Sequence, residues 1–248
     1  MNNKAIAILF ALTLSSFASY CYSQNTQLLE YAAEYEASAN GLAATATRSL
    51  RRIDENSYRL SNSLEASLAG QTLANLDQAS EFIIDGNQVV PLNYTYQLSG
   101  VSRASHAIFF NWDADVALST EGDESWQLQL NEGVMDQLSY QLAIRLALID
   151  NTEIDTTFSF EVVDGDAIEM QEYHLVGEEI ISTPLGELST LKLERVREAS
   201  DERVTEIWLA LEWDFLLTRI EQINSSGLRI SLELKSAELD GNTVRGIN

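Results

Sequence analysis

The carboxylates that stand beside tryptophan are the first candidates for chemistry in this sequence. Asp113 follows Trp112, and Asp214 follows Trp213. A carboxylic acid in an apolar setting has a raised pKa and can act as a general acid, and a glycosidase places two such acids around a sugar. One hypothesis is therefore a carbohydrate-active enzyme that uses Asp113 or Asp214. The alternative is that each Asp ends a strand and caps a turn.

Other residue types that carry catalysis or bind metals are sparse in this chain. His106 and His174 are the only histidines, and neither has a second histidine near it, as zinc sites usually do. The single cysteine, Cys21, lies close to the N-terminus, and neither a Gly-x-Ser-x-Gly motif nor a phosphate-binding glycine loop occurs. We therefore expect a protein that is not an enzyme, with no cofactor and no metal, in which both histidines are hydrogen-bonded strand residues.

Aromatic side chains indicate a binding site more directly. A groove lined by aromatic and aliphatic side chains can hold acyl chains or sugar rings. The candidate lining residues are Trp112, Trp208, Trp213, Phe110, Tyr94, Tyr96, Leu138 and Leu142. The candidates for a polar rim are Asp113, Asp214 and Arg219. An ordinary aromatic core would use the same residue types, so both interpretations stay open.

The elements that must position these residues are mainly β-strands. Residues 58–68, 92–98 and 228–234 alternate between inward-facing and polar positions, which is typical of antiparallel strands with one buried face. Turns such as Asn40-Gly41 separate the alternating runs. The predicted fold is mainly β, a strongly curved antiparallel sheet or open β-barrel of about ten to twelve strands.

One segment has the period of a helix. The apolar residues that recur there at spacings of three and four are Met135, Leu138, Leu142, Leu146 and Ile149. This spacing predicts an amphipathic helix near residues 134–149. A single helix among many strands usually packs on the concave face of the sheet.

The stretch WLALEWDFLLTRIE, residues 208–221, is apolar enough to suggest a membrane span. It contains Glu212, Asp214 and Arg219, however, and a spanning helix needs about 20 apolar residues. Apolar residues alternate on both sides of the EWD sequence. We therefore predict two strands joined by a turn at Asp214.

The N-terminus predicts export. Residues 1–23 contain Lys4, an apolar run and small residues before a cleavage point after Ser23, which is the pattern of a secretory signal peptide. Bulky Tyr20 stands where a lipoprotein signal has a small residue, which argues against a lipid anchor on Cys21. The prediction is a signal peptide over residues 1–23 and one periplasmic β-rich domain over residues 24–248, with a frayed tail from about residue 240.

The formal net charge of −23 restricts the partners. A chain this acidic repels nucleic acid and anionic headgroups. We expect no nucleic-acid partner, and no stable membrane span once the signal peptide has been removed. The remaining candidates are a lipidic or envelope-derived ligand, or another envelope protein.

Five segments, in order, resemble an exported bacterial family of unknown function, the family numbered 3108. They are YEASANGLAATATRSLRR, FFNWDADV, MDQLSYQLAIRLAL, STPLGELSTLKLERVRE and IWLALEWDFLLTRIE. Ala44 stands where the family usually has Gly, and Leu217 stands where it usually has Pro. The family has no agreed activity, so the resemblance implies a fold and an exported location.

The C-terminal strands are also similar to the end of the periplasmic lipoprotein carriers of the LolA and LolB type. The shared pattern is Trp-Leu, a Leu-x-x-Arg-Ile strand, a Gly turn and a closing alternating strand. That resemblance implies a curved sheet that wraps helices and holds acyl chains.

Together these features predict a non-catalytic binding or carrier protein with an apolar groove for a lipidic or envelope-derived ligand. The alternative is a structural or scaffolding partner of an envelope complex that has no small ligand. The carbohydrate-active enzyme is the third hypothesis.

Overall fold

A computed structural model describes residues 28–247 of the chain, except residues 40, 151–156, 197–203 and 224–228. The predicted signal peptide lies outside the described residues. Among those residues, no helix is long and apolar enough to cross a membrane.

One antiparallel sheet contains all fifteen strands that the described residues form. The strands before the helix are β1 (Tyr31–Ala39), β2 (Leu42–Arg52), β3 (Ser57–Leu68), β4 (Gln71–Asp85), β5 (Gln88–Gly100), β6 (Ala104–Asn111), β7 (Val116–Glu121) and β8 (Glu124–Gln129). Those after it are β9 (Thr157–Asp164), β10 (Ala167–Thr183), β11 (Gly186–Arg195), β12 (Val204–Ala210), β13 (Leu216–Ile223), β14 (Arg229–Leu239) and β15 (Asn242–Thr243). Their order is β8-β7-β6-β5-β4-β3-β2-β1-β14-β13-β12-β11-β10-β9, with β15 on β14.

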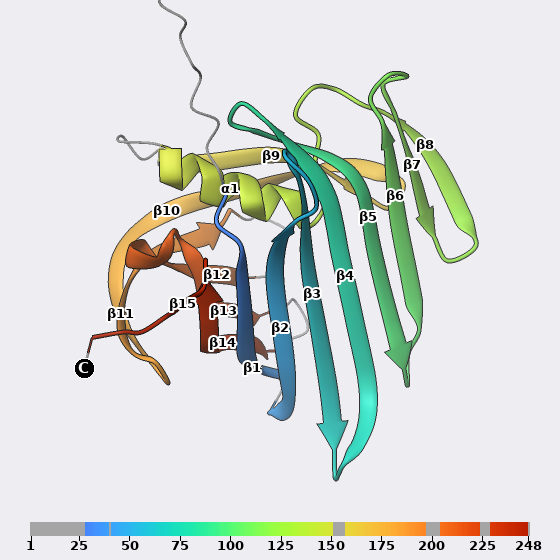
Figure 1. The fold of residues 1–248 in the computed structure, drawn as a ribbon. Helices are drawn as coiled ribbons and strands as arrows, with labels where there is room; N and C mark the ends of the chain where they lie inside the picture. The colour runs from blue at the N-terminus through green and yellow to red at the C-terminus, as the bar shows by residue number, and fades with distance from the viewer. Residues whose placement is uncertain (1–27, 40, 151–156, 197–203, 224–228, 248) are drawn as a thin grey trace, which may run out of the picture.

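The sheet curls around the helix α1 (Ser139–Asp150), which crosses the inside of the curve (Figure 1). The sheet does not close, since β8 and β9 end the strand order. The segment before α1 partly covers the edge of β9. There the backbone N–H of Met135 donates to Glu161 at 2.8 Å, and that of Val163 donates to Met135 at 2.9 Å. The predicted fold class is therefore confirmed.

Strand alternation builds the core on the concave face. Tyr35 of β1, Leu60 of β3 and Phe82 of β4 are all buried there and belong to one continuous apolar cluster that also includes Leu142 and Leu146 of α1. Burying one such side chain stabilises the fold by about 1.5–3 kcal/mol. The helix is thus held by its apolar face, as the spacing of its residues predicts.

The helix begins later than the sequence predicts, at Ser139 rather than near residue 134. The Asp136 carboxylate accepts hydrogen bonds from the backbone N–H groups of Leu138 and Ser139, at 2.8 and 2.9 Å. The Ser139 hydroxyl accepts one in return from the backbone N–H of Asp136, at 2.8 Å. This reciprocal cap, together with the pairing of Met135 to β9, keeps residues 134–138 out of the helix.

Two further details differ from the sequence prediction. The described residues form fifteen strands rather than about ten to twelve. The tail from about residue 240, predicted to be frayed, is folded. Asp240 and Gly241 both have positive φ and make a tight turn, after which Val244 is buried and Ile247 exchanges two backbone hydrogen bonds with Glu187.

Gly100, at the end of β5, is expected to be intolerant of a side chain. Its φ is +114°, and a Cβ atom there would overlap the backbone of Leu73 and Ala74. Gly100→Ala should lower the free energy of unfolding by about 2–3 kcal/mol in a urea titration. Gly41 has a φ of +82° but open space around it, so Gly41→Ala should cost only about 1 kcal/mol. Equal losses in the two variants would contradict the steric explanation.

Candidate functional site

A partly enclosed cavity of about 280 Å³ lies between α1 and the concave face of the sheet. Its apolar wall comes from α1, β12 and β13, and it includes Leu142, Ile144, Ile207, Leu209, Leu217 and Ile220. Its polar lining includes Arg48, Gln141, Arg145, Tyr140, Tyr173 and Gln171. Polar side chains make up much of the lining, and they converge opposite the apolar wall. A pocket that combines an apolar wall with convergent polar groups can bind a small molecule.

Arg145 is the most deeply buried cation of the cavity wall, with only 5% of its surface exposed. Its Nε donates to the backbone oxygen of Asp214 at 2.6 Å, and its Nη2 lies 3.8 Å from a carboxylate oxygen of the same residue. The guanidinium carbon lies 5.1 Å from the centroid of the Tyr31 ring. Neither Nη atom has a hydrogen-bond partner among the described residues, although both are buried.

Arg48 approaches the same tyrosine from β2. Its Nε donates to the Tyr31 hydroxyl at 2.9 Å. Its Nη1 donates to Gln141 of α1 at 3.0 Å and to Asn62 of β3 at 3.3 Å. Tyr31 therefore lies between two guanidinium groups, and Arg48 joins the sheet to the helix.

The two arginines influence each other electrostatically. Burial lowers the pKa of Arg145; Tyr31 and Asp214 raise it, and the positive charge of Arg48 lowers it. A guanidinium keeps its charge in proteins even so. Arg48 and Arg145, two of the cations on the cavity wall, therefore face neutral groups more often than acids.

Local structure explains how the sequence places these groups. Arg48 shares the inner face of β2 with Ala46 and Leu50, since strand residues alternate between the faces. Gln141 and Arg145 are one helical turn apart and so lie on the same side of α1. Neither arginine was among the predicted site residues. The available signal was an arginine within the apolar run AIRLAL of the helix.

The predicted lining residue Leu142 does line this cavity. Leu138 is buried at the start of the helix region. Tyr94 is buried on β5 and its hydroxyl accepts from Gln78 Nε2 at 3.1 Å, while Tyr96 is half-buried on the same strand. These three residues belong to the apolar core or pack against it, and they do not line the cavity.

Trp112 and Phe110 lie at a different hollow. Their rings stack with centroids 5.9 Å apart, and the Trp112 indole N–H donates to the backbone oxygen of Pro91 at 2.7 Å. Trp112 lines an open hollow of about 690 Å³, which Ala143 and Ala147 of α1 also line. The structure thus has two separate hollows, whereas the sequence analysis predicted a single groove lined by residues from both.

Trp208 does not face the cavity, which corrects the prediction. Ile207 and Leu209 line the cavity, so Trp208 lies on the other face of β12. Its ring lies under Lys192 Nζ and Arg219 Cζ, at 4.8 and 5.7 Å from the centroid. Arg219 is its register partner and is not on a cavity rim.

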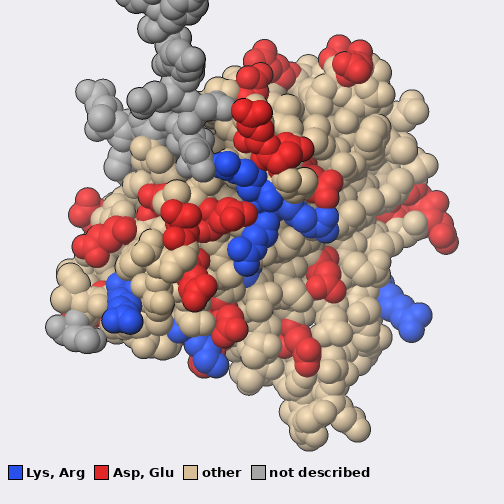
Figure 2. Space-filling model, viewed as in Figure 1, with Lys and Arg blue, Asp and Glu red and all other residues tan. Residues whose placement is uncertain are grey.

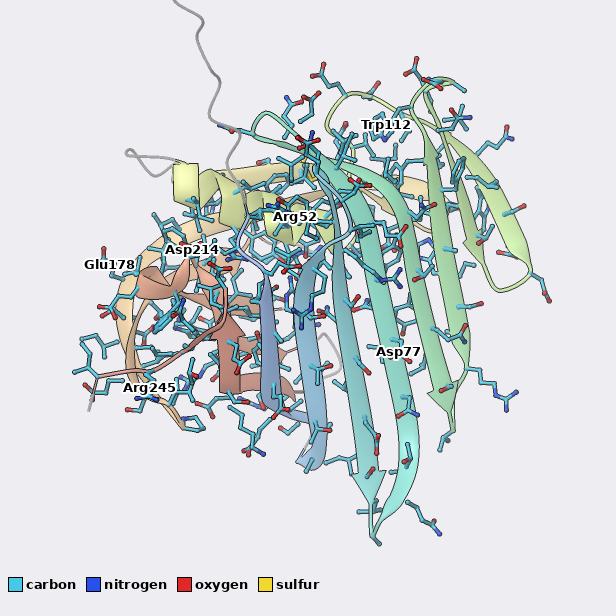
Figure 3. The ribbon with its side chains drawn as sticks, viewed as in Figure 1. Arg52, Asp77, Trp112, Glu178, Asp214 and Arg245 are labelled. Atoms are coloured by element: carbon cyan, nitrogen blue, oxygen red, sulfur yellow. The ribbon has the colours of Figure 1, made fainter. Side chains whose placement is uncertain are left out.

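The predicted turn at Asp214 is confirmed, since a short helix η1 (Leu211–Trp213) joins β12 to β13 and Asp214 has a φ of +51°. The Trp213 indole N–H donates to the backbone oxygen of Arg245 at 3.2 Å, so this ring packs on the C-terminal segment. Asp113 is exposed between β6 and β7. In Figure 3, Trp112, its chain neighbour, lies far from Asp214, so the two acids are not paired across one site.

Both histidines are hydrogen-bonded strand residues, as predicted. His106 Nε2 lies 3.1 Å from the Ser119 hydroxyl, and His174 Nδ1 lies 2.9 Å from the Thr157 hydroxyl. Burial lowers the pKa of His106. The described residues contain no group of three or more His, Cys, Asp or Glu side chains placed to hold a metal ion.

A strongly curved antiparallel sheet around one helix defines this chain as a member of the barrel-like all-β class. A family model matches residues 30–234, and the chain belongs to that family, which is described as a protein of unknown function (DUF3108). No curated protein matches the sequence.

One solved structure shows the same fold. The chain is similar to a β-barrel-like protein of the domain of unknown function DUF1849 from Brucella abortus. The TM-score is 0.55 and the sequence identity is 7%, over 86% of this chain and 98% of that one. A protein of Parabacteroides distasonis, described as a candidate lipoprotein, has a TM-score of 0.36 and 10% identity, over 86% of this chain and 96% of the other. The first of these likenesses shows the shared fold.

Proposed function

We propose that this chain is a non-catalytic binding or carrier protein of the bacterial periplasm, and that it holds a lipidic or envelope-derived ligand in the cavity between α1 and the sheet. The observation that carries this proposal is the cavity of about 280 Å³, with its apolar wall and convergent polar groups. The export signal predicted in residues 1–23 supports the location. The fold supports the proposal as well, since the curved sheet and α1 leave this cavity between them.

The contacts of the candidate acids support a role without catalysis. The backbone oxygen of Asp214 accepts from Arg145 Nε, and Asp214 lies in the turn after η1. A glycosidase places two carboxyl groups around one sugar, whereas the two candidate acids lie in separate turns. Asp113 is exposed and lies in another turn.

The full chain, exported to the periplasm of a bacterial host, is expected to carry lipid through purification. Solvent extraction followed by mass spectrometry should recover an amphiphile in roughly stoichiometric amount, because dissociation would expose the apolar wall to water. The extracted protein should then bind decanoate or decanol in a calorimetric titration. Recovery of no amphiphile, together with no binding of either probe, would overturn the proposal.

A further inference from the structure

The buried guanidinium of Arg145 has more donors than partners. Its Nη1 and Nη2 atoms make no hydrogen bond to any described residue, yet each is shielded from solvent. A buried charged donor without a partner is strongly destabilising, and native proteins rarely keep one without a functional reason. Nε alone is satisfied, by the backbone oxygen of Asp214.

The charge around the two arginines is not balanced by carboxylates. Asp214 lies 3.8 Å from Nη2, which is beyond hydrogen-bonding distance. The Arg48 guanidinium donates its hydrogen bonds to neutral groups, on Tyr31, Asn62 and Gln141. Two cations with one nearby carboxylate leave a local excess of positive charge.

This local excess contrasts with the rest of the molecule. The chain has a formal charge of −23, and Figure 2 shows acidic side chains spread over the face that it draws. Basic side chains gather near the centre of that face, where Figure 3 labels Arg52. Asp164, Glu169 and Arg195 also line the cavity, from β9, β10 and β11. Of the carboxylates, Asp214 is the one with a leading electrostatic influence on Arg145.

We infer that Arg145 and Arg48 form an anion subsite, which binds the carboxylate or phosphate group of an amphiphilic ligand whose apolar chain lies against Ile207 and Ile220. Planar guanidinium groups bind such oxyanions through paired, charge-assisted hydrogen bonds. Both arginines line the same cavity as the apolar wall, so the head group and the apolar chain of one ligand would both bind within it. This inference rests on the proposed function and adds the class of ligand.

Three probes with the same chain and different head groups test the subsite. Binding of decanoate, decyl phosphate and decanol to the delipidated full chain is measured by calorimetry at neutral pH. Both anionic probes should bind at least about tenfold more tightly than decanol. The anionic probe that binds with the higher affinity shows whether the subsite prefers a carboxylate or a phosphate head group.

Arg145→Met keeps an unbranched apolar stem and removes the charged guanidinium group. This variant should bind both anionic probes at least about tenfold more weakly than the wild type, and its affinity for decanol should change by less than about twofold. Its thermal unfolding should occur at the same or a higher temperature, since removing an unsatisfied buried charge does not destabilise the fold. Arg59→Met is the matched control, because Arg59 is exposed and pairs with Glu81; it should change none of the three affinities.

The outcomes separate the two proposals. Equal binding of decanoate and decanol to the wild type would overturn the anion subsite and leave the apolar binding site standing. Loss of all three probes in Arg145→Met would also overturn it, because the arginine would then be structural. Binding of none of the probes to the wild type would overturn the subsite and the proposed function together.

Discussion

Replacing Asp136 with alanine is expected to lower the free energy of unfolding by about 3 kcal/mol. The carboxylate is fully buried and accepts hydrogen bonds from the Ser80 hydroxyl at 2.7 Å and from two backbone N–H groups at the start of α1. Alanine would leave all three donors buried without an acceptor. Urea denaturation followed by circular dichroism measures the change, and a loss below about 1 kcal/mol would contradict this role.

Asp136→Asn is the matched control, because an amide oxygen still caps the helix and costs far less than alanine. The pair also tests a pH dependence. Burial raises the pKa of Asp136, although its hydrogen bonds from Ser80, Ser139 and Leu138 lower it. The native chain therefore binds a proton here at pH values where the unfolded chain has released it, so the wild type should lose stability relative to D136N as the pH rises from the ordinary carboxyl pKa to the raised one. A constant difference across that window would contradict the raised pKa.

Filling the cavity is expected to abolish ligand binding. Ile207 of β12 lines the cavity opposite Ile220 of β13, and its side chain is only half-buried, so Ile207→Trp should place an indole ring in the space. Affinity for decanoate and for decanol should both fall by at least about tenfold in calorimetry, since the apolar chain would have no room. The fold should tolerate the change at a cost of about 1–3 kcal/mol.

Ile180→Trp serves as its control. Ile180 of β10 is 67% exposed and does not line the cavity, so the same substitution there adds an indole ring outside. Both binding constants should stay within about twofold of the wild type. If Ile207→Trp binds both probes as well as this control does, the ligand does not occupy the cavity beneath α1.

Alternation of residue types predicted much of the sheet because burial on one face is a local property of each strand. The alternating residues 58–68 fall in β3, and residues 229–234 of the second run fall in β14; residue 228 lies outside the described residues. The two strands predicted around Asp214 are β12 and β13. The residue pattern gave a wrong prediction where contacts with residues distant in sequence determine the local structure. Residues 134–138 have helical spacing but are held by β9 and by the cap at Asp136.

The site was less predictable for the same reason. Trp208 was predicted to line the groove because it is aromatic. Its neighbours Ile207 and Leu209 face the cavity, so Trp208 faces the other side of the sheet, where its ring contacts Lys192 and Arg219. Arg48 and Arg145 were not predicted as site residues, since nothing local in the sequence shows that they meet at Tyr31. Their pairing depends on the contact of α1 with the concave face. Sequence can therefore suggest that a groove exists, whereas the head-group chemistry requires the folded chain.

The position of β1 between β2 and β14 has a consequence for how the chain matures. Tyr31 pairs with Leu239, so one side of the first strand has no partner until the last long strand has been synthesised. Contacts this distant in sequence form slowly, and until then β1 presents an unpaired edge to other chains. A chain truncated before β14 would have two further open edges, at β1 and β13, and such a product is expected to aggregate.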